Sequence, residues 1–168
     1  MIAIHYVIND LSASQLSAKA GNMSRYKMLT SDYPLLLLGV VYIEINGYNI
    51  LEEFVGTDYV LKIALQLTKV YNSIYDDKGD KTVHFFEDPV ELKIIKKNNN
   101  AVIKLCLRHN TRSKTVNEYV VSLYNLRKAI ENANANLLRY LKTHHYNYWN
   151  YLSEEDVFSK LKVYKNIM

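Results

Sequence analysis

The chain has 168 residues, 49% hydrophobic and 23% charged, so it is about the size of one domain and can bury a core without a metal or a disulfide. Its single cysteine, Cys106, excludes an internal disulfide and favours a reducing compartment. The longest apolar run, Leu35 to Ile43, is too short for a membrane helix, and the first residues show no basic export signal. These features predict a soluble, cytoplasmic protein without a membrane partner.

Charge is distributed unevenly along the chain. Residues 1–91 contain 7 basic and 12 acidic residues, a net charge of −5, whereas residues 92–168 contain 14 and 5, a net charge of +9. The basic half predicts an oppositely charged partner, which could be nucleic acid, a membrane surface or an acidic protein. A solvated surface, or lysine enrichment in an AT-rich genome, explains the same counts, so these interpretations stay open.

The first elements in chain order are a strand and a hairpin. Met1 to Ile8 alternates loosely as a strand, and the polar residues 9–30 form at most a short helix. Asn46-Gly47 then joins two apolar segments, Leu35–Ile45 and Tyr48–Val55, and this pair suits a type I′ turn because both turn residues need a positive φ. The turn predicts a register in which Ile45 faces Tyr48, Ile43 faces Ile50 and Val41 faces Glu52.

A helix is predicted next. Thr57 or Asp58 offers a side-chain oxygen to the free amides of its first turn, and the apolar pattern continues to about Tyr75. Its polar residues form one narrow stripe, so most of its surface is apolar. We therefore expect this helix to be the most buried element of the protein.

Three strands follow, over Thr82–Glu87, Val90–Lys97 and Ala101–His109, and a turn at residues 98–100 joins the last two. A register with Lys97 opposite Val102 places five apolar residues on the core face: Leu92, Ile94, Ile103, Leu105 and Leu107. In that register Cys106 lies on the outer face opposite Lys93, a neighbour that would favour the thiolate of an exposed cysteine.

The C-terminal part predicts a strand over Thr115–Val121, a long helix capped by Ser122, and a last helix that begins at Ser153. Together these elements predict the α+β class: one domain over residues 1–168, with a mainly antiparallel sheet built from two hairpins, a buried central helix and C-terminal helices.

The sequence contains no recognisable catalytic or metal motif. Cys106 and His109 are three residues apart on a strand and point to opposite faces, so they cannot act as a nucleophile and its base. The adjacent pair His144-His145 lacks the i, i+4 spacing by which a helix presents two ligands to zinc. No glycine-rich phosphate loop is present. We therefore predict a protein that is not an enzyme and has no cofactor or metal.

Three groups of side chains are candidate binding sites. Aromatic residues are frequent in interface hot spots and can also stack on bases, and the densest cluster is Tyr146, Tyr148, Trp149 and Tyr151. The same segment could instead close the core as a loop between two helices. An acidic surface on the first hairpin would suit a basic partner, and its residues are Glu44, Glu52 and Glu53. A basic patch on the second hairpin comprises Lys93, Lys97, Lys104 and Arg108.

In length, order of elements and lack of a catalytic motif, the chain resembles the small bacterial immunity proteins of contact-dependent inhibition and polymorphic toxin systems. The resemblance includes the Asn-Gly hairpin that begins Leu-Gly-Val-Val-Tyr-Ile-Glu-Ile-Asn-Gly, residues 38–47. It implies a cognate toxin domain, bound and neutralised in the cytoplasm of the producing cell. Inhibitors of basic nuclease toxins are typically acidic, so either the acidic first half makes the contact or the toxin is itself acidic.

Two other function classes remain as alternatives. One is a nucleic-acid-binding module that uses the basic C-terminal half, and the other is an enzyme with an unrecognised site. A salt titration separates the first alternative from protein binding, because phosphate contacts make affinity fall steeply with salt.

Overall fold

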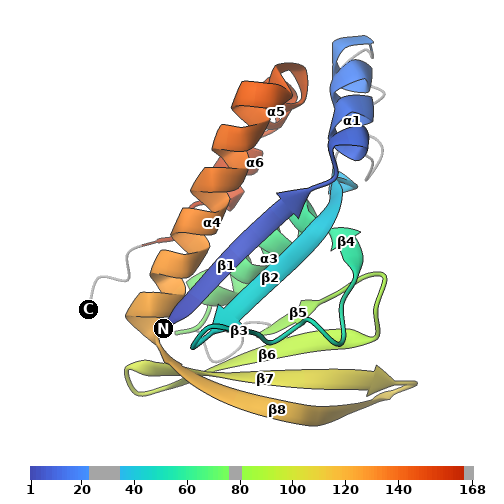
Figure 1. Ribbon diagram of the computed structural model, residues 1–168. Helices are drawn as coiled ribbons and strands as arrows, with labels where there is room; N and C mark the ends of the chain where they lie inside the picture. The colour runs from blue at the N-terminus through green and yellow to red at the C-terminus, as the bar shows by residue number, and fades with distance from the viewer. Residues whose placement is uncertain (23–34, 76–80, 165–168) are drawn as a thin grey trace.

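The computed structural model describes residues 1–22, 35–75 and 81–164, which form two antiparallel sheets and five helices (Figure 1). The first sheet contains β1 (Ile2–Ile8), β2 (Leu38–Ile45), β3 (Tyr48–Asn49) and β4 (Thr57–Tyr59). The second contains β5 (Thr82–His84), β6 (Val90–Lys97), β7 (Asn100–His109) and β8 (Arg112–Ser122). The helices are α1 (Asp10–Asn22), α3 (Val60–Asn72), α4 (Leu123–His144), α5 (Tyr146–Glu154) and α6 (Val157–Lys160). None of these helices is both long and apolar enough to cross a bilayer.

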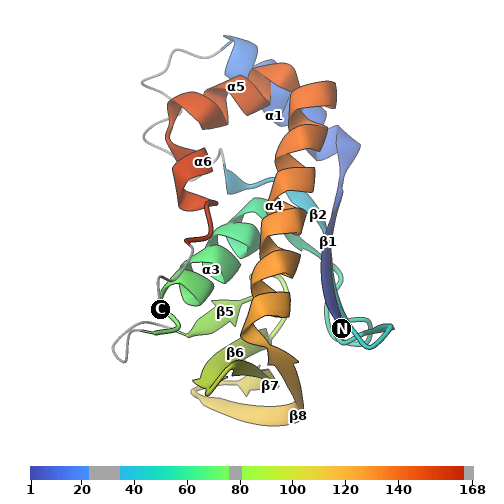
Figure 2. The same ribbon diagram turned by 90° about the vertical axis from the view of Figure 1, so that its left-hand side faces the viewer.

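The α+β class predicted from the sequence is confirmed, but the two predicted hairpins belong to two separate sheets. Helix α3 connects them, because it contacts β2 of the first sheet, β5 of the second and helix α4. Helices α1 and α5 contact each other at the end of the molecule away from the second sheet (Figure 2). Buried side chains from both sheets and from these helices form one hydrophobic cluster.

The first hairpin is correct up to Ile50, whose N–H donates to the Ile43 carbonyl at 2.9 Å in the predicted register, and wrong beyond it. Asn46 and Gly47 have φ values of 54° and 85°, and Ile45 pairs with Tyr48 as predicted. The strand ends at Asn49, whose side-chain Oδ1 accepts from the backbone N–H of Ile43 at 3.3 Å and so takes the place of a backbone acceptor. The chain then turns and returns to β2 as β4, so the predicted pairing of Val41 with Glu52 does not form.

Helix α3 buries eight of its 13 residues, as its mostly apolar pattern predicts. It begins at Val60 and not at Asp58, because Asp58 lies in β4 and its carboxylate faces another segment. Oδ2 of Asp58 accepts from the backbone N–H of Phe86 at 2.8 Å and of Glu87 at 3.4 Å. Asp58 therefore joins β4 to the loop after β5, and its predicted role as a helix cap is wrong.

The second hairpin differs from the predicted register by two residues. Lys97 pairs with Asn100 and not with Val102, because the turn contains only Asn98 and Asn99. A shift of two residues leaves every side chain on the same face. The predicted core face is therefore retained, with Leu92, Ile94, Ile103 and Leu105 buried.

The same shift moves Cys106 opposite Glu91 instead of Lys93. The cysteine is only 1% exposed, and its Sγ lies 3.5 Å from the Thr115 hydroxyl. The predicted position opposite a lysine is thus wrong, and the structure has a buried thiol opposite Glu91.

The C-terminal helices confirm one predicted cap and correct another. Ser122 caps α4, because its Oγ accepts from the backbone N–H of Asn125 at 3.1 Å. Ser153 does not begin a helix but lies near the end of α5. The segment predicted as an aromatic connection is therefore itself helical.

Candidate protein-binding site

The predicted aromatic cluster is divided between the core and the surface. Tyr148 is completely buried and Tyr151 is 8% exposed, so both belong to the core and their prediction as partner contacts is wrong. Trp149 is half-buried against Phe158, with the ring centroids 5.3 Å apart. Only Tyr146, 57% exposed, presents most of its ring to solvent.

The predicted acidic surface is also rearranged. Glu44 lies half-buried in β2, whereas Glu52 and Glu53 are exposed in the turn after β3, so the three do not lie on one ribbon as expected. Glu52 and Glu53 instead line a cleft of about 600 Å³ with Tyr48 and Tyr119. The rearrangement follows from the short β3, which ends before either glutamate.

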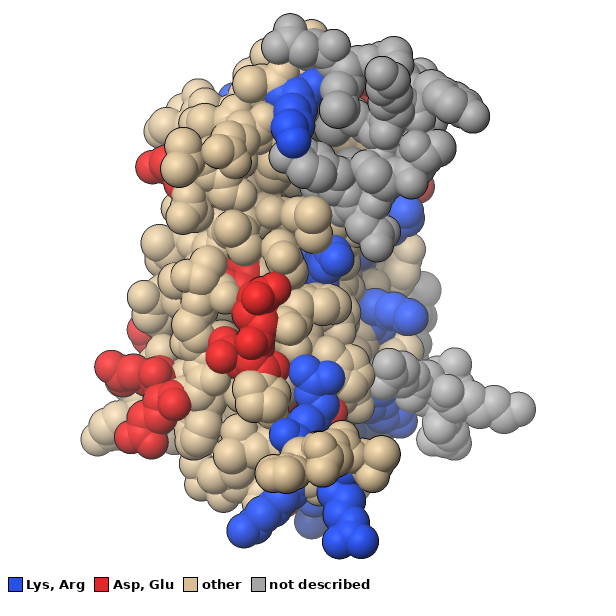
Figure 3. All heavy atoms as spheres, turned by 90° about the vertical axis from the view of Figure 1, so that its right-hand side faces the viewer, with Lys and Arg blue, Asp and Glu red and all other residues tan. Residues whose placement is uncertain are grey.

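Most of the predicted basic patch is paired within the protein. Lys93 Nζ lies 3.2 Å from Glu91, and Lys104 Nζ lies 3.2 Å from Glu118. Arg108 donates to the backbone carbonyl of Phe85 at 2.8 Å, and Lys97 is exposed. On the face shown in Figure 3, acidic and basic side chains lie next to each other, with basic ones gathered at the lower end. Internal pairing leaves less positive charge for phosphates than the sequence suggests.

Glu91 is the centre of a polar cluster on the outer face of the second sheet. It is 5% exposed and accepts from the Ser113 hydroxyl, and one of its oxygens lies 3.5 Å from Nδ1 of His84. Burial acts to raise the pKa of Glu91, but the Ser113 hydrogen bond and the Lys93 ammonium outweigh it and hold the pKa below its usual value. The cluster ties β5, β6 and β8 together. Within the described ranges, no three His, Cys, Asp or Glu residues are grouped to hold a metal ion.

A different feature, which the sequence does not reveal, is the open edge of β1. Among the residues that the structure describes, this strand pairs only with β2. The N–H of Asn9 donates to the Leu38 carbonyl at 2.9 Å, and the N–H of Asn46 donates to the Met1 carbonyl at 3.0 Å. Residues that bond a neighbouring antiparallel strand alternate with residues whose N–H and C=O point away from it. The odd-numbered residues of β1 therefore bond β2, and the even-numbered ones direct their backbone groups outward.

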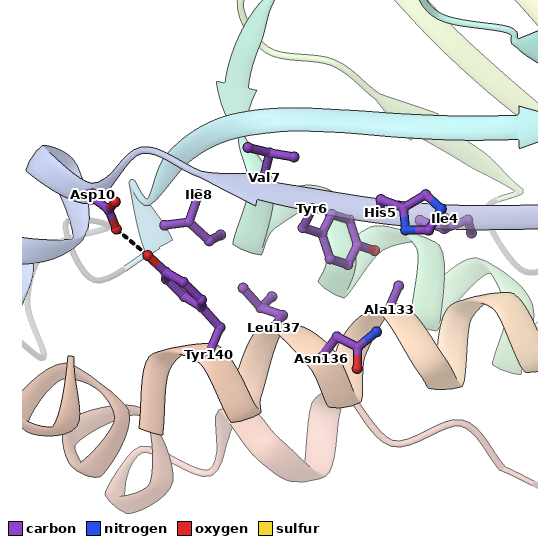
Figure 4. Close-up of a pocket in the computed structure, with 10 residues that line it drawn as sticks. All are labelled: Ile4, His5, Tyr6, Val7, Ile8, Asp10, Ala133, Asn136, Leu137 and Tyr140. Atoms are coloured by element: carbon purple, nitrogen blue, oxygen red, sulfur yellow. Dashed lines mark hydrogen bonds between the residues drawn. The ribbon is translucent and has the colours of Figure 1, made fainter. Parts of the chain in front are cut away.

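Residues along this edge of β1 line a cleft between β1 and α4 (Figure 4). The main part has a volume of about 520 Å³, and it is lined by Ile4, His5, Tyr6, Val7, Ile8, Asp10, Ala133, Asn136, Leu137 and Tyr140. A second hollow of about 290 Å³ shares three of these residues and continues along β1 toward Met1. We refer to both parts together as the β1–α4 cleft. Among the described residues, none hydrogen-bonds the outward backbone groups of Ile4 and Tyr6.

Tyr6 adds an unsatisfied polar atom to this cleft. Its hydroxyl is buried, and among the described residues it has no hydrogen-bond partner. The ring lies between β1 and α4, near Leu137 (Figure 4). Burial raises the pKa of Tyr6 above its usual value, so the hydroxyl keeps its proton and can donate. A buried hydroxyl without a partner is uncommon in folded proteins.

One end of the cleft is acidic. The side chain of Asp10 is 75% exposed, and it accepts a hydrogen bond from the Tyr140 hydroxyl while Nε2 of His145 lies 3.5 Å away. The Tyr140 hydrogen bond, with smaller effects from His145 and His144, lowers the pKa of Asp10 despite a small desolvation penalty. Asp10 is therefore a fixed negative charge where β1 meets α1.

The other long edge of the structure, β8, is protected. Its pairing with β7 shifts at Leu105 and Cys106, which leaves Val116 as an extra residue in a bulge. Glu118 is held by Lys104, and Lys114 and Arg112 add further charge to the edge. Bulges and charged side chains are common means by which edge strands avoid pairing with another chain. β1 has neither a bulge nor a lysine or arginine.

The sequence contains a partial signal for this site. Asn125, Asn132 and Asn136 recur at spacings of seven and four residues on α4, which places three amides on one side of the helix. All three are exposed and line the β1–α4 cleft. No protein-family model, curated protein or solved structure matches this chain, so its function has to be inferred from this geometry.

Proposed function

We propose that this protein binds and neutralises a partner protein in the cytoplasm, and that the β1–α4 cleft is the contact site. The observation that carries the proposal is the backbone edge of β1, which pairs with no second strand among the described residues and belongs to an open cleft beside α4. Addition of a strand to an exposed sheet edge is a recurring mode of protein recognition. The resemblance to immunity proteins indicates a bacterial toxin domain as the partner.

The polar groups of the cleft support binding of a protein segment. Residues of β1 form one wall, with the outward backbone groups of alternate residues at its edge, and exposed asparagines of α4 lie on the other. Apolar side chains of Ala133 and Leu137 lie between them. Binding sites typically combine an apolar surface with a few such polar groups. The proposed activity requires no cofactor.

Nucleic-acid binding is less well supported. Of the four basic residues predicted to form a patch, Lys93 and Lys104 form ion pairs, and Arg108 is bonded to a backbone carbonyl. Phosphate binding by these groups would have to compete with internal partners.

A growth assay tests the proposed function. The protein is co-expressed in a bacterial host with each toxin-like domain that the neighbouring genes encode, and restored growth is expected with the cognate one. In the variant Asn136→Trp, an indole added from an exposed position of α4 should fill the cleft, and we expect affinity for the toxin domain to fall at least about tenfold, with loss of rescue.

The matched control is Ala135→Trp, which adds an indole to an exposed neighbouring position of α4 that does not line the cleft. It should bind and rescue like the unchanged protein, and both variants should retain its thermal transition. Failure of the unchanged protein to restore growth would contradict neutralisation. Equal rescue by the two tryptophan variants would show that the partner binds elsewhere.

A further inference from the structure

On the basis of the proposed function, we further propose that the β1–α4 cleft takes up an extended segment of the partner as an additional strand along β1, with a basic side chain beside Asp10. This inference names both the mode of recognition and the chemistry of the segment. It can fail while the proposed function stands, because a partner could also cover the cleft with a folded surface.

The backbone of β1 provides the template for the added strand. Ile4, Tyr6 and Ile8 direct their N–H and C=O groups into the cleft, at the spacing of alternate residues, about 6.7 Å. This is the repeat at which a neighbouring strand presents its own donors and acceptors. A bound segment in extended conformation would satisfy these groups in register, whereas a helical segment has no free backbone groups to offer.

The volume and walls of the cleft suit a single extended segment. The main part, about 520 Å³, is bounded opposite β1 by α4, where the nearly buried Ala133 and Leu137 form its apolar floor. Asn136, exposed at the rim, can bond the segment from the α4 side.

Asp10 determines the charge preference of the segment. Its carboxylate lies at the α1 end of the cleft, is largely exposed, and is oriented by the Tyr140 hydroxyl. Among the residues that line the main part of the cleft there is no lysine or arginine to neutralise it. A lysine or arginine at the corresponding end of the segment would form a charge-assisted hydrogen bond with Asp10.

A peptide selection followed by backbone methylation tests this inference. Random octapeptides displayed on phage are selected on the unchanged protein and counter-selected on Asn136→Trp. The recovered peptides are then synthesised with one backbone amide at a time N-methylated, and their affinities are measured. We expect methylation to weaken binding at least tenfold at alternate positions and less than threefold at the positions between, because only alternate amides of an added strand face β1.

The charge preference is tested with the same peptides. Asp10→Asn should weaken the binding of peptides with a terminal lysine or arginine about threefold to tenfold, and raised salt should reduce the difference. The control Glu52→Gln removes an exposed carboxylate outside the cleft and should leave affinity unchanged.

Several results would overturn the inference. The selection could recover no peptide whose binding is lost in Asn136→Trp. Methylation could weaken binding equally at neighbouring positions. Basic peptides could bind Asp10→Asn as tightly as the unchanged protein. None of these results decides the outcome of the growth assay, which tests the proposed function separately. Rescue that depends on Asn136 without alternating methylation would support partner binding and refute strand addition.

Discussion

Replacement of Tyr148 by alanine is expected to lower the free energy of unfolding by about 3–5 kcal/mol, the range found when a large aromatic side chain is removed from a packed core. Tyr148 is completely buried and is part of the hydrophobic cluster that includes residues of both sheets. Denaturant melts of the purified variant measure the change.

Tyr146→Ala is the matched control, because it removes the same side chain two residues earlier in α5, where the ring is 57% exposed. It should cost about 1 kcal/mol at most. Similar small losses for both variants would mean that α5 does not pack on the core. A large loss confined to Tyr148 would show that this tyrosine is structural and not a partner contact.

Asp58→Ala is expected to cost about 3 kcal/mol. Its buried carboxylate accepts from the backbone N–H groups of Tyr59, Phe86 and Glu87, and removing it leaves the partly buried amides without their acceptor. Hydrogen bonds to charged groups contribute about 1.5–3 kcal/mol, and an amide left without its acceptor adds a further penalty. Denaturant melts again provide the measurement.

Asp88→Ala is the control for this prediction. Asp88 also accepts a backbone N–H across the same two segments, from Gly56 at 3.0 Å, but that bond is exposed to solvent. Water can replace the lost acceptor there, so we expect a loss below about 1 kcal/mol. Equal losses for the two aspartates would contradict the view that buried Asp58 holds β4 against the loop after β5.

Local patterns predicted much of the fold. The Asn46-Gly47 turn, the apolar α3 and the Ser122 cap are each determined by residues close together in sequence. Core faces on β6 and β7 were correct even with the wrong register, because strand faces repeat every two residues.

The errors have two causes. Side chains with alternative partners decide some boundaries, as when Asn49 ends a strand and Asp58 bonds a distant loop instead of capping α3. The second cause is an overlooked helical period. Tyr148, Tyr151 and Leu152 have the spacing of one helical face, and all three are buried.

Beyond the asparagine spacing on α4, local sequence does not predict the β1–α4 cleft. It requires that β1 pair on one side only, with a strand some 40 residues later, and that α4 lie along the other side. Both elements were predicted individually, but their adjacency depends on how the two sheets pack on α3. Whether an edge is paired is decided by residues far away in sequence, so a strand pattern alone does not show it.

Amide hydrogen exchange along β1, resolved by residue with NMR, tests the central claim most directly. In the free protein the amides of Ile4, Tyr6 and Ile8 should exchange faster than those of Ala3, His5 and Val7, because only the second group bonds β2. Saturation with the partner segment should slow the first group at least tenfold and change the second group little. Equal protection of both groups in the free protein, or unchanged exchange at Ile4, Tyr6 and Ile8 in the complex, would contradict an open edge that binds the partner.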